Sequence, residues 1–391
     1  MSFTEDDARH MARALQLARR GLYTTDPNPR VGCVIAQDGA VVGEGFHERA
    51  GEPHAEIQAL RAAGSAARGA TVYLTLEPCC HHGRTPPCSQ ALIEAGIARL
   101  VAAMQDPNPK VAGRGFDELR GRGIAVAVGL MEAEAAARNP GFIARMSRGR
   151  PLVRVKLGAS LDGRTALASG ESKWITGEAA RADVQKWRAR SSAILTGIGT
   201  VLADDPSLNV RLVGIGDVQG CTSVAEDRMS GATRQPLRVV VDSRLRLPPS
   251  AKMLKLPGKT LIACAATDAA RADALRAAGG EVVVLPATET GIDLATLLRL
   301  LAEREVNEVL VEAGATLSGA LIEAGLVDEL VLYYAPHLLG DAGRGMFTFP
   351  IERMADRIDL EIQDVRAVGR DWRIVAKIVR SEEEPSLTPD P

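Results

Sequence analysis

The segment from His54 to Cys88 constrains the fold more than any other, because it holds a complete set of candidate metal ligands. His54 and Glu56 open a stretch with apolar residues at helical spacing, so both should project from a first helical turn into one cleft. Residues 70–76 alternate in polarity and are rich in residues that favour β-strands, which predicts a strand ending near Cys79. Cys88 follows nine positions after Cys79. The fold must therefore bring a helix start and a strand end together.

These residues fit a catalytic zinc site. One histidine and two cysteines, His54, Cys79 and Cys88, supply three ligands of a tetrahedral zinc ion and leave the fourth place for water. Zinc lowers the pKa of that water to about 7, and Glu56 is the natural carrier of its proton. The alternative is a structural zinc closed by Cys80, His81 or His82, but such a site would give Glu56 no role.

The loop between the two cysteines also carries information. Pro78 predicts a second helix start or a tight turn just before Cys79, which would bring a thiolate close to backbone N–H groups. An H-x-E followed by P-C-x-x-C is typical of zinc deaminases that act on nucleobases. Here the cysteines lie further apart, so the loop must fold beside the metal. His81 and Arg84 are its candidate substrate contacts.

Size and composition limit the class of protein. The 391 residues predict two domains, and a net charge of -2 gives no general attraction to nucleic acid. Three of the six cysteines surround the proposed metal, which favours a reducing cytosol over a disulfide framework. The start of the chain lacks a signal-peptide pattern, and no apolar run approaches the ~20 residues that span a bilayer. We therefore expect a cytoplasmic protein that acts on a small molecule, without nucleic-acid or membrane partners.

The N-terminal part alternates strands and helices. Residues 6–20 predict a surface helix, and residues 31–46 predict two strands joined by an Asp38-Gly39 turn, a strong hairpin signal. Further strands and helices follow to residue 129, so we expect an α/β layer structure with a mixed sheet. The sequence Asp-Pro-Asn-Pro occurs at residues 26–29 and again at 106–109, where composition favours a plain turn.

A domain boundary is expected at residues 141–151, a Gly/Arg/Pro stretch that shows neither a strand nor a long helical pattern. The expected domains are 1–147 and 148–380. Residues 381–391 form an acidic, Pro-rich tail, which we expect to be disordered, and 212–235 read as an inserted loop.

The C-terminal part carries a candidate phosphate site. Residues 309–312 predict a strand buried on both faces, and Gly314 begins a turn into a helix over 317–324. The free N–H groups at such a helix start attract phosphate. Further strand ends at residues 196–204 and 239–243 should converge on the same crevice, although the usual dinucleotide-binding glycine pattern is absent. Arg188 and Arg211 are suited to bind a ribose phosphate.

Four motifs resemble a known family: DPNPRVG (26–32), GEGFH (43–47), HAE (54–56) and PCCHHGRTPPC (78–88). They resemble the deaminase half of the bifunctional riboflavin-biosynthesis proteins, the diaminohydroxyphosphoribosylaminopyrimidine deaminase/reductases. The resemblance implies a cytidine-deaminase-like three-layer α/β/α domain, in which Asn28 reads the pyrimidine and His47 is a further substrate contact. This family usually has Ser where Cys80 stands, which implies that Cys80 is not a required ligand.

The second half resembles the reductase half of the same family in KLGASLDGRTA (156–166), SGESKWIT (169–176), TVLADDPSLNVR (200–211) and VEAGATLSGAL (311–321). The resemblance implies a dihydrofolate-reductase-like α/β domain that uses NADPH. The implied cofactor contacts are Gly158, Trp174, Thr200, Asp204, Ser243, Gly314, Ala315, Thr316, Leu317, Ser318, Gly319 and Ala320. The implied substrate contacts are Ser172, Arg188, Leu208, Arg211 and Glu312. From composition alone, Trp174 could equally be a core anchor.

Together these features predict a zinc- and NADPH-dependent enzyme of riboflavin biosynthesis, with one Zn²⁺ per deaminase domain. It would deaminate a phosphorylated ribosylaminopyrimidine and then reduce its ribosyl group, and we expect a homo-oligomer. Two other hypotheses remain open. One is a polynucleotide deaminase, which would need a basic, aromatic-rich surface although aromatics make up only 3% of the chain. The other is a zinc-stabilised nucleotide-binding sensor without turnover.

Overall fold

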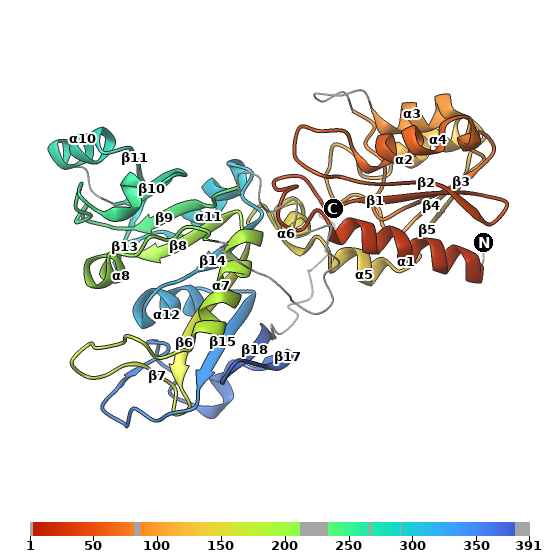
Figure 1. Ribbon diagram of the computed structural model, residues 1–391. Coiled ribbons are helices and arrows are strands. Elements are labelled where there is room, and N and C mark those ends of the chain that lie inside the picture. The colour runs from red at the N-terminus through yellow and green to blue at the C-terminus, as the bar shows by residue number, and fades with distance from the viewer. Residues whose placement is uncertain (1–2, 82–86, 212–233, 266–267, 290, 380–391) are drawn as a thin grey trace, which may run out of the picture.

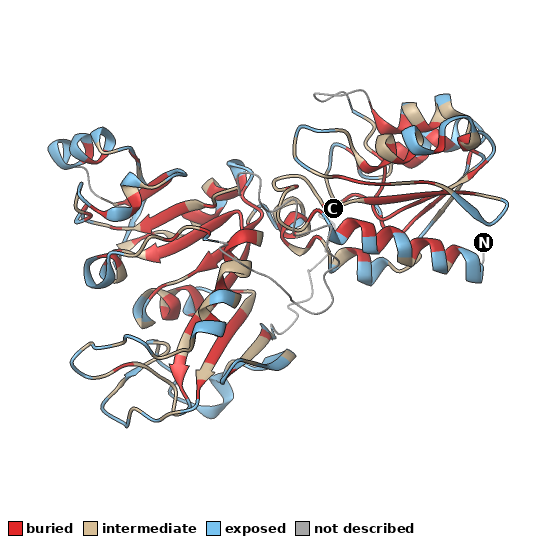
Figure 2. Ribbon diagram, viewed as in Figure 1, coloured by how far each residue is buried: buried red, intermediate tan, exposed pale blue. Residues whose placement is uncertain are grey.

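The computed structural model describes residues 3–81, 87–211, 234–265, 268–289 and 291–379. Two α/β halves, each built around its own sheet, lie side by side, with helix α6 between them (Figure 1). Figure 2 shows the central strands of each sheet and the inward faces of the helices as the buried part of each half. Among the described helices, none combines the length and the apolar composition needed to cross a bilayer.

The N-terminal half is a five-stranded sheet between two helical layers. Its strands are β1 (Gly32–Gln37), β2 (Ala40–Phe46), β3 (Thr71–Leu74), β4 (Arg99–Ala102) and β5 (Ala125–Val128), in the order β2-β1-β3-β4-β5. β1 is antiparallel to both β2 and β3, whereas β3, β4 and β5 are parallel. Helices α2 (Ala55–Ala63), α3 (Cys88–Ala95) and α4 (Arg114–Arg120) cover one face; α1 (Glu5–Arg19), α5 (Glu132–Ala136) and α6 (Pro140–Arg148) cover the other. A short 3₁₀ turn spans Gly64–Ala67.

The elements that open this half confirm the sequence predictions. Helix α1 begins with a capping box, in which the Thr4 hydroxyl accepts from the Asp7 amide and the Asp7 carboxylate accepts from the Thr4 amide. The hairpin of β1 and β2 turns at Asp38 and Gly39, which both have positive φ (51° and 79°). Two successive positive φ values match the twist of a hairpin, which explains the preference for Asp-Gly.

The C-terminal half is a nine-stranded mixed sheet in the order β11-β10-β9-β8-β14-β6-β15-β18-β17. The strands from β11 to β15 in this order are parallel, and β18 and β17 form an antiparallel ribbon at the edge. These strands span β6 Leu152–Ser160, β8 Ala193–Gly197, β9 Leu237–Val241, β10 Thr260–Cys264, β11 Gly280–Val284, β14 Glu308–Val311, β15 Glu329–Ala335, β17 Leu360–Val368 and β18 Asp371–Ile378. The wholly buried β14 confirms the strand expected at 309–312.

Helices cover both faces of this second sheet. The core on one face includes leucines of α11 (Leu294–Glu303) and α12 (Ala315–Glu323). The other face packs against α7 (Glu178–Arg190) at one end and α8 (Ile198–Asp204) and α10 (Ala269–Ala277) at the other. The remaining short elements are β7 Arg164–Ala166, β12 Ala287–Thr288, β13 Gly291–Ile292, β16 Arg344–Gly345 and the 3₁₀ turns Lys252–Lys255 and Met354–Asp356.

The stretch 141–151, which shows neither a strand nor a long helical pattern in the sequence, nevertheless contains most of a short helix. Helix α6 occupies Pro140–Arg148 and is capped by Gly149, which has a left-handed conformation. Gly141 lies inside this helix, at a position with no room for a side chain. A Cβ there would stand 2.3 Å from Glu308 Cγ and 2.7 Å from the Asn307 carbonyl oxygen. The glycine that argued against a helix therefore allows α6 to pack closely against the second half. The tail 381–391 and most of the 212–235 insertion lie outside the described residues.

Candidate active site

Helix α2 positions the first two candidate groups of the metal site. His54 is its N-cap residue and makes no capping bond with its side chain, so the imidazole remains available to a ligand. Glu56 lies in the first turn and is only 3% exposed. Both residues line the same cavity of about 610 Å³, as their spacing predicted. Burial, followed by the negative charge of Cys79, raises the pKa of Glu56 to about 7.

The two cysteines reach this point from different elements. Cys79 follows β3, and Cys88 is the first residue of α3, so the helix begins after Pro87 and not at Pro78 as one reading expected. The predicted contact with a backbone N–H group is present, because the Cys88 amide donates to Cys79 Sγ at 3.3 Å. Hydrogen bonds from Cys88 and His54 outweigh burial and lower the pKa of Cys79 to about 4, whereas the pKa of Cys88 is raised.

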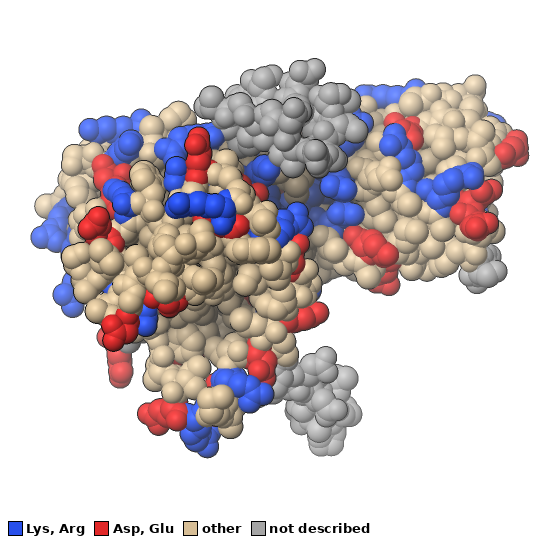
Figure 3. Space-filling view, turned by 60° about the horizontal axis from the view of Figure 1, so that its bottom comes forward, with Lys and Arg blue, Asp and Glu red and all other residues tan. Residues whose placement is uncertain are grey.

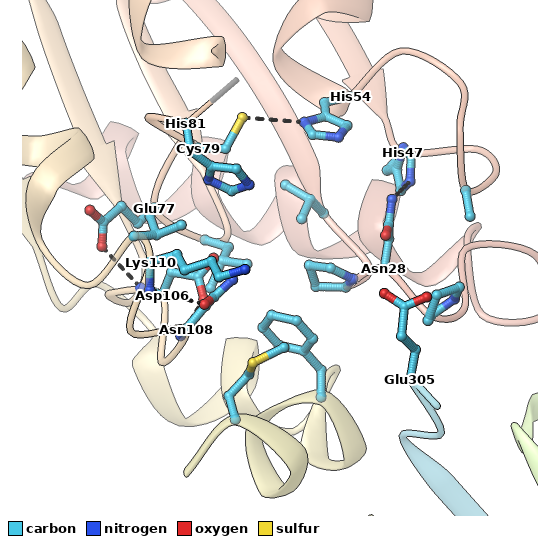
Figure 4. Close-up of a pocket in the computed structure, with 18 of the residues that line it drawn as sticks. Asn28, His47, His54, Glu77, Cys79, His81, Asp106, Asn108, Lys110 and Glu305 are labelled. Atoms are coloured by element: carbon cyan, nitrogen blue, oxygen red, sulfur yellow. Dashed lines mark hydrogen bonds between the residues drawn. The ribbon is translucent and has the colours of Figure 1, made fainter. Parts of the chain in front are cut away.

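The geometry of the three side chains fits a zinc ion. His54 and Cys79 face each other in Figure 4, with His54 Nδ1 3.6 Å from Cys79 Sγ. His54 Nδ1 also lies 3.3 Å from Cys88 Sγ, and the ligand atoms of the three residues lie within 4.8 Å of one another. Tetrahedral zinc with ordinary Zn–N and Zn–S bonds separates such atoms by about 3.5 Å. The donor set therefore matches zinc in both chemistry and spacing.

The neighbours that could close the site are placed differently. Cys80 Sγ lies 3.8 Å from the Lys110 carbonyl oxygen and does not belong to the ligand group found among the described residues. His81 is exposed and lines the cavity. His82 and the predicted substrate contact Arg84 lie outside the described residues. Among the side chains that are described, the arrangement leaves three ligands and a buried carboxylate.

Asn28 and His47 stand together on another wall of the cavity (Figure 4). His47 Nδ1 lies 3.3 Å from the Pro53 carbonyl oxygen, which can only accept, so Nδ1 carries the proton and Nε2 is an acceptor. The Asn28 amide, 3.1 Å away, then donates to Nε2 and keeps its oxygen as a free acceptor. Burial lowers the pKa of His47 to about 4, which keeps the ring neutral at pH 7.

The second Asp-Pro-Asn-Pro segment also lines this cavity, which its composition did not indicate. It does form the expected turn, since the Asn108 amide donates to Asp106 at 2.8 Å, but Asp106, Asn108 and Lys110 face the cavity as well (Figure 4). Burial raises the pKa of Asp106 to about 6. Glu77 anchors the segment by accepting from the Asp106 amide at 3.1 Å. The repeat of the tetrapeptide was the signal that could have revealed this placement.

In the second half, several predicted cofactor residues lie in or just after the parallel strands of the sheet. Gly314 caps α12 without covering its amide groups, and a Cβ there would meet nothing within 4 Å. Gly158 on β6 packs against Thr176, and Lys173 pairs with Asp204 at 3.3 Å, so the 172–176 segment lies close to α8. Thr200 belongs to α8, and Ser243 follows β9.

Some predicted cofactor residues have other surroundings. Trp174 is 70% exposed with the Arg181 guanidinium 4.7 Å above its ring, so the core-anchor alternative is wrong. Ser318 is buried, and a Cβ on Gly319 would stand 2.1 Å from the Thr348 carbonyl oxygen. These two residues therefore face the interior, whereas Gly314 and Thr316 are exposed at the start of the helix.

Two of the predicted substrate residues of this half, Arg188 and Arg211, lie near Glu312. Arg188 is buried and holds Glu312 in a two-pronged ion pair, Nε to Oε1 at 2.5 Å and NH2 to Oε2 at 2.9 Å. Its remaining NH1 donates to the Asn209 carbonyl at 3.1 Å. Lys156 and Arg211 are further cations that help lower the pKa of Glu312 despite its burial. Leu208 packs in the core, and Ser172 is half-buried.

Comparison with known proteins gives the same division of the chain. A family model described as "Cytidine and deoxycytidylate deaminase zinc-binding region" matches residues 4–104, and one described as "RibD C-terminal domain" matches residues 151–374. The riboflavin biosynthesis protein RibD of Escherichia coli K12 is 52% identical over 93% of this chain and 97% of its own length. That of Haemophilus influenzae is 47% identical over 96% of this chain and 98% of its own length.

Solved structures agree over the same length. Acinetobacter baumannii RibD superposes with a TM-score of 0.86 at 46% identity, covering 96% of this chain and 99% of that one. A Thermotoga maritima protein described as a diaminohydroxyphosphoribosylaminopyrimidine deaminase/5-amino-6-(5-phosphoribosylamino)uracil reductase gives a TM-score of 0.81 at 30% identity, with the same coverage.

Proposed function

The chain belongs to the RibD family of bifunctional riboflavin-biosynthesis enzymes, and from this premise we propose which of its residues perform each reaction. It is a zinc-dependent deaminase and an NADPH-dependent reductase. It hydrolyses the amine of 2,5-diamino-6-(5-phosphoribosylamino)pyrimidin-4(3H)-one and then reduces the ribosyl group, giving 5-amino-6-(5-phosphoribitylamino)uracil. The observation that carries the residue assignment is the group of His54, Cys79 and Cys88, which lies at the wall of the cavity that His54, Cys79 and Glu56 line.

In the deaminase half, His54, Cys79 and Cys88 hold the zinc ion. A bound zinc ion acts as a Lewis acid that makes water a nucleophile at neutral pH. Glu56 would take one proton from the attacking water and deliver it to the ring nitrogen. It would then carry a second proton, from the hydroxyl group that the attack leaves on the ring carbon, to the departing ammonia. A carboxyl with a pKa of about 7 is suited to this work, because it can both accept and return a proton near neutral pH.

The remaining walls of the cavity orient the pyrimidine. Neutral His47 holds the Asn28 amide by its nitrogen, so the Asn28 oxygen is presented as an acceptor for the substrate. We assign His81 and Arg84 as further substrate contacts, and we add Asp106 and Asn108 on the strength of their place in the cavity wall.

In the reductase half, NADPH supplies the hydride that reduces the sugar carbon. The free amide groups at the start of α12, from Gly314 onward, are suited to the diphosphate of the cofactor. Gly158, Trp174, Thr200, Asp204, Ser243, Ala315, Thr316, Leu317 and Ala320 complete the proposed cofactor contacts, whereas Ser318 and Gly319 face the interior of the half. Ser172, Arg188, Leu208, Arg211 and Glu312 are the proposed substrate contacts, with Arg188 acting chiefly by fixing Glu312.

We assign residues 1–147 to the deaminase domain and residues 148–380 to the reductase domain, because α6 ends at Arg148 and β6 starts at Leu152. A small phosphorylated substrate fits this type of enzyme. We also propose a cytoplasmic homo-oligomer without nucleic-acid partners. Figure 3 shows one face of the molecule, on which both halves carry acidic as well as basic side chains. This mixture and the small net charge of -2 support the absence of a nucleic-acid partner, which would favour a basic surface.

A coupled assay with the diaminopyrimidine substrate, zinc and NADPH tests these assignments, with ammonia release and NADPH oxidation followed separately. Glu56→Gln should keep its zinc and lose at least about 100-fold in deamination, because it cannot transfer a proton. NADPH oxidation with the deaminated intermediate should be unchanged. A zinc-replete Glu56→Gln protein that deaminates at the wild-type rate would refute the role of Glu56. Failure to bind either nicotinamide cofactor would refute the reductase assignments.

A further inference from the structure

We propose that Asn307, a residue of the reductase half, is a positioning residue for the deaminase, because it holds the loop that carries Asn28. The inference rests on the proposed role of Asn28 in binding the pyrimidine. The affinity of the deaminase cavity for its substrate then depends on the Asn307 side chain, which comes from the other half of the chain.

Asn307 is 5% exposed and uses its whole side-chain amide at the junction between the halves. Its Nδ2 donates to Asp26 Oδ1 at 2.9 Å and to the Pro27 carbonyl oxygen at 2.8 Å. Its Oδ1 accepts from Arg145 Nε at 2.7 Å. A carbonyl only accepts and a guanidinium only donates, so these partners fix the orientation of the amide.

Other reductase groups hold the same loop. Asp26 Oδ1 also accepts from the Ser192 hydroxyl at 2.8 Å, and Asp26 Oδ2 pairs with Arg234 at 3.2 Å. At the other end of the loop, Arg30 pairs with buried Glu308 at 3.1 Å. Asp26 to Arg30 is thus a short segment of the deaminase half, and residues of the reductase half bind it at both ends.

Asn28 lies between the contacts of Asp26 and those of Arg30. It follows Pro27 directly, its amide N–H donates to Thr25 at 2.9 Å, and its side chain reaches His47 in the cavity. Glu305, two residues before Asn307, lines the same cavity near Asn28 (Figure 4), so this part of the reductase half reaches the deaminase site itself. A shift of the loop by a fraction of an ångström would misdirect the Asn28 oxygen, and misplacement by ~1 Å can cost about 100-fold in rate.

A purely structural role for Asn307 predicts something different. If the contact only joined the two halves, its loss would lower stability and affect both activities. If it positions Asn28, its loss should raise KM for deamination while zinc binding, the proton transfer by Glu56 and the reductase reaction continue. The split between KM and kcat therefore separates the two roles.

Asn307→Asp is the informative substitution. The carboxylate keeps an acceptor for Arg145 but removes both hydrogen bonds to the loop and places a negative charge beside Asp26. We expect KM for deamination to rise about tenfold, with kcat within about threefold of wild type. Zinc content and kcat/KM for NADPH-dependent reduction of the deaminated intermediate should be unchanged.

Two further variants make the test specific. Asp26→Asn combined with Asn307→Asp exchanges donor and acceptor, so the double variant should recover part of the lost affinity even though Pro27 still lacks its donor. Arg304→Gln is the control. It lies in the same connection, but its guanidinium pairs with Glu281 at 2.7 Å on the surface of the reductase half, and it should leave KM unchanged.

The outcomes are distinct. A folded, zinc-replete Asn307→Asp protein with a wild-type KM for deamination would overturn the inference, as would equal losses in both reactions. If this variant does not fold, Ser192→Ala, which removes one donor to Asp26, should raise the same KM a few-fold, and an unchanged KM would overturn the inference. If wild-type protein releases no ammonia, or if Asn28→Ala leaves KM unchanged, the proposed function of the site fails instead.

Discussion

The identity of single side chains decides the chemistry of the zinc site. His54, Cys79 and Cys88 meet within ligand distance, whereas Cys80, although adjacent to Cys79, is directed toward the Lys110 carbonyl. Glu56 is buried near these three residues but does not belong to the ligand group found among the described residues. Of the two neighbouring cysteines, therefore, only Cys79 belongs to the candidate ligand group.

This difference predicts unequal effects of two similar substitutions. Cys88→Ser should lower zinc affinity by more than about 100-fold, since even changes outside the ligand set cost roughly 10- to 100-fold. Cys80→Ser should retain one zinc per chain with wild-type affinity. Competition with a chromogenic chelator measures both values. Equal zinc loss in the two variants would show that Cys80 is a ligand.

Asp7 gives a pH-dependent contribution to stability. Burial acts to raise its pKa, but hydrogen bonds from Arg99, Thr4 and Tyr73 outweigh it and lower the pKa from 3.8 to about 2. A lowered pKa means that the charged form stabilises the fold. The contribution, about 2 kcal/mol, is therefore complete above about pH 5 and is lost as the pH falls toward 2.

Asp7→Asn should remove this contribution at pH 7 and flatten the decline in unfolding free energy between pH 5 and 2. Urea unfolding at several pH values measures the change. Asp6→Asn is the matched control, because Asp6 pairs with Arg9 on the surface and should change stability by less than about 0.5 kcal/mol. Parallel pH curves for wild type and Asp7→Asn would contradict the assignment.

At the scale of elements, the position of α2 depends on glycines in β2. A Cβ on Gly45 would stand 2.3 Å from the Ala55 carbonyl oxygen and 2.6 Å from the Ala59 nitrogen, both in the backbone of α2. Gly43 faces the same helix, 2.3 Å from the Ala59 carbonyl oxygen. The Gly-Glu-Gly sequence of β2 thus lets the helix that carries His54 and Glu56 lie directly on the sheet.

Gly45→Ala should therefore destabilise the protein by about 1–3 kcal/mol, because a rigid backbone cannot yield to the added methyl group. It should also weaken zinc binding, since α2 must move away from the cysteines. Thermal unfolding and chelator competition report the two effects. Gly199→Ala in α8, where a Cβ would meet nothing within 4 Å, is the control and should be neutral or slightly stabilising. Unchanged stability in Gly45→Ala would refute the close packing.

At the scale of the whole molecule, a buried ion cluster joins the two halves. Glu308, 2% exposed, pairs with Arg30 of the deaminase half at 3.1 Å and with Arg154 and Arg190 of the reductase half. Burial acts to raise the pKa of Glu308, but these guanidinium groups hold it well below its ordinary value. Glu308 is the first residue of β14 and directly follows Asn307. The start of β14 therefore both joins the halves and holds the loop that carries Asn28.

Glu308→Gln would leave three guanidinium groups without their shared anion and should cost about 3–5 kcal/mol in unfolding free energy. The loss should appear in the unfolding of both halves, which can be followed separately by zinc release and by NADPH protection. Asp356→Asn breaks an exposed pair with Arg353 and should change stability by less than about 0.5 kcal/mol. A cost below 1 kcal/mol for Glu308→Gln would show that the cluster does not stabilise the junction.

The sequence by itself determined the class of elements, the candidate zinc ligands and the family, because hydrophobic period, turn chemistry and ligand types are local properties. The Asp38-Gly39 hairpin and the His54, Cys79 and Cys88 set needed no long-range information. Tertiary structure alone decided the rest. The close packing of Gly141 against Glu308 and the hydrogen bond from Asn307 to Asp26 appear only in the folded chain. These contacts join residues more than 150 positions apart, and no local pattern encodes such pairs.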